Sequence, residues 1–149
     1  MAGRFKQKVS KSGRSKPRKV LPNGRNANSG NFLMMEYWMF ESHAYRELQA
    51  GPRSLLWELI RLFNGRNNGR IGLGVRSAAQ RLNVSKDTAS SYFKSLVEAG
   101  FIVATRSGGF NMKDPTSRRA TEWRLTWHPS DEGPATKEFM RPRLVKSRS

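Results

Sequence analysis

Residues 75–102 contain two helical patterns separated by a short turn, and this arrangement restricts the possible folds more than any other feature of the sequence. The first pattern has apolar residues at i, i+3, i+4 and i+7, namely Val75, Ala78, Ala79 and Leu82. Ser85 is the predicted N-cap of a second helix, and Gly100 is its predicted C′ residue. Because the turn has only three or four residues, the helices must cross closely, and the small alanines allow this contact.

The second helix has two different faces. Its apolar residues recur at the spacing of one helix face and are predicted to face the core: Ala89, Tyr92, Phe93, Leu96 and Val97. The remaining positions carry short polar side chains and two lysines: Lys86, Asp87, Thr88, Ser90, Ser91, Lys94 and Ser95. Such a face is either a solvated surface or a surface that lets the helix backbone come close to a partner. The Glu/Lys pairs typical of a solvated helix are missing from it.

The flanking segments predict the rest of the fold. Residues 31–48 indicate one helix or two short ones, and the next helix begins near Gly51-Pro52 and ends at Asn64-Gly65. Residues 71–73 indicate a short strand, and residues 101–107 and 121–127 indicate two strands with a flexible loop between them. Trp123, Leu125 and Trp127 alternate on one face of the last strand, which predicts core packing. The predicted fold class is α+β, a winged helix-turn-helix with a helical bundle and a small antiparallel wing sheet.

The segment "SAAQRLNVSKDTASSYFKSLVEAGFI" resembles the helix-turn-helix of winged-helix families in bacteria and mobile elements. It is similar to the form AxxLxVSxxTVxxxLxxLxxxGLI found in regulators of the MarR and GntR type and in phage and plasmid replication initiators. The matching residues are Ala79, Leu82, Val84, Ser85, Thr88, Phe93, Leu96, Gly100 and Ile102. The chain departs from the form at Ala89, where valine is usual, and at Ser90-Ser91, where a charged residue is frequent.

The second helix is therefore the candidate for reading bases in a DNA major groove. Short polar side chains near its N-terminus would reach base edges, and the residues placed in this role are Lys86, Asp87, Thr88, Ser90 and Ser91. Asp87 is equally well explained as a partner of the helix dipole. Contacts to phosphate are expected from Lys94, Arg76, Arg81, Arg106, Arg118 and Arg119.

Basic residues dominate the whole chain. It has 28 Lys and Arg against 11 Asp and Glu among 149 residues, a net charge of +17, and an isoelectric point near 11.4. Residues 1–30 are predicted to form a disordered basic arm without acids, whose nine cations are Arg4, Lys6, Lys8, Lys11, Arg14, Lys16, Arg18, Lys19 and Arg25. Residues 31–128 are predicted to form the DNA-binding domain, and residues 129–149 a basic C-terminal tail. This charge favours a polyanion as partner, above all double-stranded DNA.

Several other classes of function find little support. The chain has no cysteine and only two histidines, so neither a metal site nor a cofactor is expected, and no catalytic motif indicates an enzyme. No apolar stretch predicts a membrane span, so the expected location is the cytoplasm, at the bacterial nucleoid. We expect a transcriptional regulator. The alternatives are a replication-initiation or nucleoprotein-assembly protein and an RNA-binding or ribosome-associated protein; a winged helix that binds only proteins fits the charge least. A homodimer would use residues 32–48 or the wing.

Overall fold

Two consecutive helices and a short turn form the centre of the chain, as the sequence predicts. Helix α4 (Val75–Leu82) ends at Asn83, whose φ of 54° and ψ of 48° are left-handed. Asparagine tolerates this conformation because its short side chain can hydrogen-bond locally. Helix α5 (Lys86–Glu98) begins at Ser85, whose side chain accepts a hydrogen bond from the Thr88 N–H. The predicted N-cap is therefore confirmed. The computed structural model describes residues 32–111 and 114–141.

Three further helices precede this pair. Helices α1 (Tyr37–Glu41) and α2 (His43–Glu47) correspond to the two short helices that the sequence allowed in residues 31–48. Ser42 separates them, because its hydroxyl donates to the Met39 carbonyl at 2.6 Å and accepts from the Tyr45 N–H at 3.3 Å. Helix α3 (Ala50–Leu62) has Pro52 in its first turn, where a missing N–H leaves no hydrogen bond unmade.

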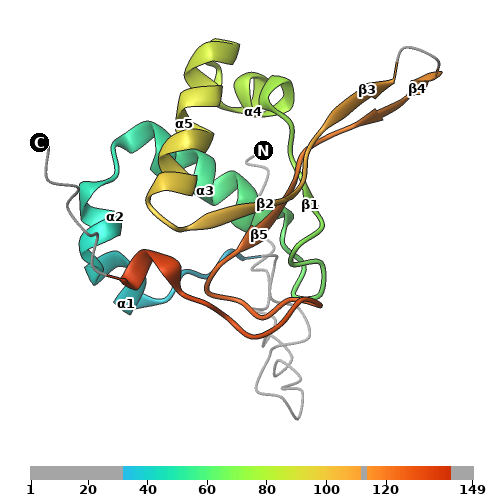
Figure 1. Cartoon of the computed structure of the whole chain (residues 1–149). Coiled ribbons are helices and arrows are strands. Elements are labelled where there is room, and N and C mark those ends of the chain that lie inside the picture. Colours follow the sequence, from blue (N-terminus) through green and yellow to red (C-terminus); the bar gives the residue numbers. More distant parts are fainter. Residues whose placement is uncertain (1–31, 112–113, 142–149) are drawn as a thin grey trace, which may run out of the picture. The chain divides into compact units, whose positions relative to one another are not determined.

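A three-stranded antiparallel sheet completes the α+β fold. Its strands are β1 (Ile71–Gly72), β2 (Ile102–Arg106) and β5 (Glu122–Leu125), in the order β1-β5-β2. Strands β3 (Gly109–Asn111) and β4 (Asp114–Arg119) form a separate antiparallel pair beyond β2 and β5 (Figure 1). The expectation of a flexible loop between β2 and β5 was therefore wrong. Pairing of the hairpin backbone overrides a local sequence rich in Gly, Asn and Pro, which disfavours strands.

The core lies between α3, α5 and the sheet. Leu55, Leu59 and Leu96 are fully buried, and the Phe93 ring stacks on the Trp123 ring at a centroid distance of 4.7 Å. The predicted inward orientation of Phe93 and Leu96 is confirmed, and so is the burial of Trp123, Leu125 and Trp127.

Val97 does not belong to the packed face of α5, and its predicted place there was wrong. Its exposed fraction is 44%, whereas Ala89 is fully buried. At 100° per residue, Val97 lies about 80° around the helix from Ala89, whereas Phe93 and Leu96 lie within about 40° of it, so Val97 falls outside the buried stripe.

The chain continues to pack after β5, so the predicted tail boundary at residue 128 was also wrong. A 3-10 helix, η1 (Glu138–Met140), brings Phe139 against the core with an exposed fraction of 4%. Its ring stacks on Phe101 at 4.5 Å. One aromatic residue among polar neighbours carries no periodic signal, so only the tertiary contact reveals its role. Residues 142–149, the rest of the predicted tail, and residues 1–30, the predicted arm, lie outside the described residues.

Candidate nucleic-acid interface

The outer face of α5 is exposed along its N-terminal two and a half turns. Five side chains point away from the core, with positions that follow the helix period: Lys86, Asp87, Ser90, Ser91 and Lys94. The opposite positions, Ala89 and Phe93, are buried, so the orientation of this face is fixed by the core. The candidate interface thus presents three short polar side chains and two lysines in an orientation that the core determines.

The hydroxyl groups on this face differ in their hydrogen bonds. The Thr88 hydroxyl lies 2.8 Å from the Ser85 hydroxyl, which makes it part of the N-cap and leaves it only half-exposed. Ser91 donates to the Thr88 carbonyl at 2.7 Å, so its oxygen retains acceptor capacity toward a partner. Within the described part of the chain, the Ser90 hydroxyl has no hydrogen-bond partner. Ser90 and Ser91 are therefore better placed than Thr88 to contact an external ligand.

A shallow hollow of about 550 Å³ lies between α4 and the start of α5. Lys86 and Arg76 both line it, although they belong to different helices. Gln80 and Asn83 line it as well, and neither was predicted from the sequence as a site residue. Both amide side chains are exposed and share the hollow with Lys86. A helical-wheel plot of α4 would have placed Gln80 on the exposed face of that helix. The hollow combines two cations with two amide groups beside the exposed face of α5.

The arginines proposed as phosphate contacts are not equivalent. Arg81 lies 3.0 Å from the Glu58 carboxylate, which also contacts Arg61 at 3.3 Å, so Arg81 links α4 to α3. Arg106 lies 4.0 Å from Glu122 on the neighbouring strand. Lys94 has a similarly loose ion pair with Glu98 at 3.9 Å. Its shorter ion pair and the smaller exposed fraction of its side chain, 34%, make Arg81 the least available of these three groups.

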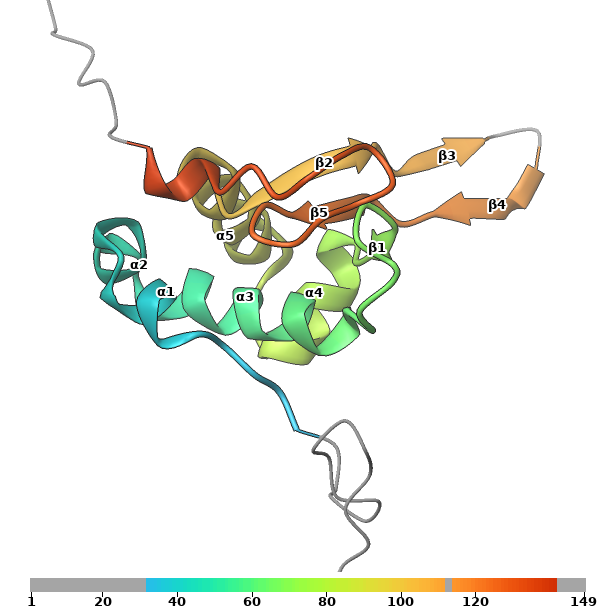
Figure 2. The same ribbon diagram turned by 90° about the horizontal axis from the view of Figure 1, so that it is seen from below.

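Two of the candidate arginines lie on the hairpin. Arg119 is exposed at the end of β4, whereas the side chain of Arg118, also on β4, lies outside the described part of the structure. Figure 1 shows the hairpin, α4 and the N-terminal end of α5 at the same side of the folded unit. Figure 2, turned by 90°, shows β3 and β4 continuing the direction of β2 and β5. The nine cations of residues 1–30 belong to the part of the chain that is not described.

In the segment considered for a dimer contact, the exposed large apolar side chains lie at its start. Phe32, Met34 and Tyr37 have exposed fractions of 65%, 69% and 78%. Met39 and Tyr45, later in the same segment, are buried in the core of their own chain. An apolar contact with a second copy through residues 32–48 would therefore involve the residues up to the start of α1.

Searches against family models, curated proteins and solved structures give no match to this chain. In residues 32–111 and 114–141, none of the helices has the length and apolar character needed to cross a bilayer. In the same residues, His, Asp and Glu side chains nowhere gather in a group of three that could hold a metal ion.

Proposed function

We propose that this chain is a winged helix-turn-helix protein that binds duplex DNA with a sequence preference and regulates transcription. Helix α5 would enter the major groove as the recognition helix, and the β3–β4 hairpin would act as the wing. The order of elements supports this assignment, since α3, β1, α4, α5, β2, the hairpin and β5 follow each other in the chain. The net charge of +17 supports a polyanionic partner.

The observation that carries the proposal is the composition of the exposed face of α5. Ser90 and Ser91 are short enough for the helix backbone to approach the floor of a major groove. Lys86 would bind guanine O6 and N7 or a phosphate, and Ser91 would accept from an exocyclic amine because its proton is directed to the Thr88 carbonyl. Asp87 stabilises the helix N-terminus in the absence of DNA and would accept from cytosine N4 in its presence.

Phosphate contacts would come from groups beside this face. Arg76 lies next to Lys86 in the hollow between the two helices, and Arg119 is exposed on the hairpin. These contacts would set the position of the protein on the duplex without discriminating between sequences. Arg81 would contribute less, because it already binds Glu58 at 3.0 Å.

The test is a selection from random duplexes with the full-length protein, followed by footprinting. The informative variant carries Lys86→Ala, Ser90→Ala and Ser91→Ala, and leaves the Ser85–Thr88 cap intact. Removal of each base-reading side chain should weaken binding to the selected site by about 1 to 3 kcal/mol and relax preference at one or two base pairs. A matched control carries Ser54→Ala and Arg66→Ala. Ser54 is an exposed helix serine that donates to the Ala50 carbonyl at 3.0 Å, and Arg66 is an exposed loop cation.

The outcomes separate the proposal from its alternatives. If the triple variant still distinguishes the selected duplex from other duplexes as well as the wild type does, α5 does not contact the bases that determine the preference. Selection of no duplex, together with tight binding of single-stranded or structured RNA, would favour the RNA-binding alternative. A symmetric pair of sites would indicate a dimeric regulator, and an array of direct repeats would indicate an initiator that assembles on an origin.

A further inference from the structure

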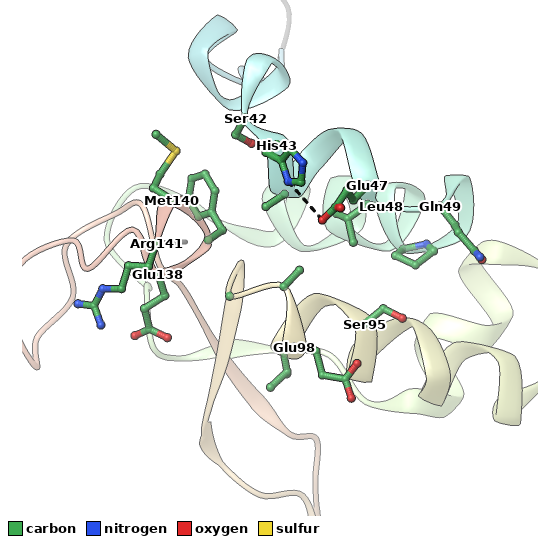
Figure 3. A pocket seen from close by; sticks show the side chains of 16 residues that line it. Ser42, His43, Glu47, Leu48, Gln49, Ser95, Glu98, Glu138, Met140 and Arg141 are labelled. Carbon is green, nitrogen blue, oxygen red and sulfur yellow. Dashed lines mark ion pairs between the residues drawn. The ribbon is translucent and has the colours of Figure 1, made fainter. Parts of the chain in front are cut away.

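An open groove of about 1100 Å³ lies at the opposite end of α5 from the proposed recognition residues. Its walls come from α2 and the start of α3 on one side and from the last turn of α5 on the other, with η1 at a third side (Figure 3). Leu48, Val97 and Met140 contribute apolar surface. Val97 and Met140 have exposed fractions of 44% and 53%, so part of the apolar surface of the groove is open to solvent.

The charge of the groove is opposite to that of the chain as a whole. Three carboxylates line it, from Glu47, Glu98 and Glu138, against one arginine, Arg141. The carboxylates have only loose ionic partners in the described residues: His43 at 3.4 Å, Lys94 at 3.9 Å and Arg124 at 3.8 Å. A phosphate backbone would be repelled here, so the groove is not an extension of the DNA surface. Its chemistry fits a cationic segment with apolar side chains.

The chain itself provides such a segment directly after the groove. Residues 142–149 read "PRLVKSRS", with three cations around the apolar pair Leu144 and Val145 and no acid. Arg141, the residue before this segment, lines the groove. Its position is fixed by η1, since Phe139 is buried and the Lys137 N–H donates to the Thr126 carbonyl at 2.9 Å.

The dimensions are compatible with a short peptide. Helix α5 lines the groove with Ser95, Val97 and Glu98, over a rise of about 4.5 Å at 1.5 Å per residue. Three extended residues cover about 10 Å. Four residues, Leu144 and Val145 with one flanking cation on each side, are therefore long enough to extend past the α5 side of the groove.

We propose that residues 142–149 bind in this groove of their own chain, with Leu144 and Val145 against Val97 and Met140 and the cations against Glu47 and Glu98. Binding within one chain requires no other partner, because the short connection gives the segment a high effective concentration at the groove. The bound segment would cover the apolar surface and leave the N-terminal half of α5 free. This inference does not depend on the proposed DNA binding.

The chain has no cysteine, so pairs of introduced cysteines report the contact directly. The full-length variant Val97→Cys with Leu144→Cys is oxidised under mild conditions, and the control is Ser90→Cys with Leu144→Cys, on the outer face of the same helix. The first pair should form a disulfide within one chain about ten times faster than the control pair. Adding Glu47→Lys and Glu98→Lys should remove most of this difference, and so should high salt.

Equal rates for the two pairs would overturn the proposal, and so would disulfides formed mainly between two chains, which would indicate a second copy as the occupant. Thermal melting of each reduced variant checks that the fold is retained. If Val97→Cys lowers the melting temperature, Ser95→Cys replaces it, since that side chain is half-buried and borders the same groove. An unchanged rate after the charge reversals would also contradict the proposed role of the carboxylates.

Discussion

At the scale of single residues, the side chain of Asn68 forms hydrogen bonds with backbone groups at the end of β5. Its side-chain amide donates to the carbonyls of Leu125 and His128, both at 2.9 Å, and its oxygen accepts from the Leu125 N–H at 2.7 Å. The residue is buried, with an exposed fraction of 3%. Buried backbone groups that lose such partners are costly because water cannot reach them.

Asn68→Ala should therefore lower the free energy of unfolding by about 1 to 3 kcal/mol. Asn68→Asp should be at least as destabilising, since a carboxylate cannot donate to the two carbonyls. Urea denaturation measures both effects, with Gln80→Ala as the control at an exposed position. Wild-type stability in Asn68→Asp would contradict the role given to the amide donors.

His128 predicts a pH dependence of stability. Partial burial lowers its pKa below the ordinary value of 6.5, and the nearby Glu36 carboxylate opposes this shift less strongly. The ring stacks on Phe63 at 4.5 Å. Because the unfolded chain binds the proton more readily, the contribution of His128 to stability is present above the ordinary pKa and is lost as pH falls toward the lowered one.

Wild-type stability should thus decline as pH falls through the ordinary histidine pKa of 6.5 toward the lowered pKa, and His128→Gln should remove part of that decline. Urea denaturation across this range measures the effect. His43→Gln is the matched control, because His43 is exposed and pairs only loosely with Glu47 at 3.4 Å. If His128→Gln and the wild type show the same pH dependence, protonation of His128 does not cause the decline in stability.

At the scale of elements, Gly100 lets the end of α5 pack closely against the backbone of η1. Its φ is +82°, and a Cβ at this position would lie 2.8 Å from the Phe139 backbone nitrogen. Gly65 has a similar φ of +89° but no atom within 4 Å of such a Cβ. The two glycines therefore separate the cost of the left-handed backbone from the cost of a steric clash.

Gly65→Ala should destabilise the fold by about 1 kcal/mol, through the backbone conformation alone. Gly100→Ala should cost clearly more, about 2 to 4 kcal/mol, because the backbone of η1 must also move. The comparison of the two unfolding free energies is the measurement, and Trp38 and Trp127, which lie against Phe139, provide a fluorescence signal for the displacement of η1. Equal losses would mean that η1 does not pack tightly on Gly100.

At the scale of the whole molecule, the charge is distributed between the folded unit and the ends of the chain. Nine of the 28 cations fall in residues 1–30, which carry no acid. If this segment binds phosphates, it should supply affinity and not specificity.

Deleting residues 1–30 should flatten the plot of log K against log salt by about 3 to 4 units, if about four cations reach phosphates at about 0.9 each. The ratio of specific to non-specific affinity should stay nearly constant. The measurement uses full-length and truncated protein on selected and scrambled duplexes across a salt series. An unchanged slope would mean that the arm serves another partner, and a collapsed ratio would mean that the arm itself reads groove width or sequence.

Local patterns in the sequence were sufficient for the elements whose ends are set by neighbouring residues. The cap at Ser85, the C′ position of Gly100 and the buried faces at Phe93 and Trp123 all follow from spacing and side-chain chemistry. The exposed face of α5 is predictable for the same reason, because one buried stripe determines which side chains must point outward.

Contacts between distant segments were decided only by the tertiary structure. Phe139 packs on Phe101, Arg81 binds Glu58, and Asn68 caps a strand 57 residues away, none of which has a local signature. The β3–β4 hairpin belongs to the same class, since its strands are stabilised by pairing with each other and not by their own composition. Sequence by itself thus determined where α4 and α5 begin and end and, apart from Val97, which side chains of α5 face the core, because those choices depend on residues within one or two turns. Only the tertiary structure determines which polar and aromatic side chains make contacts within the chain and which remain available to a partner.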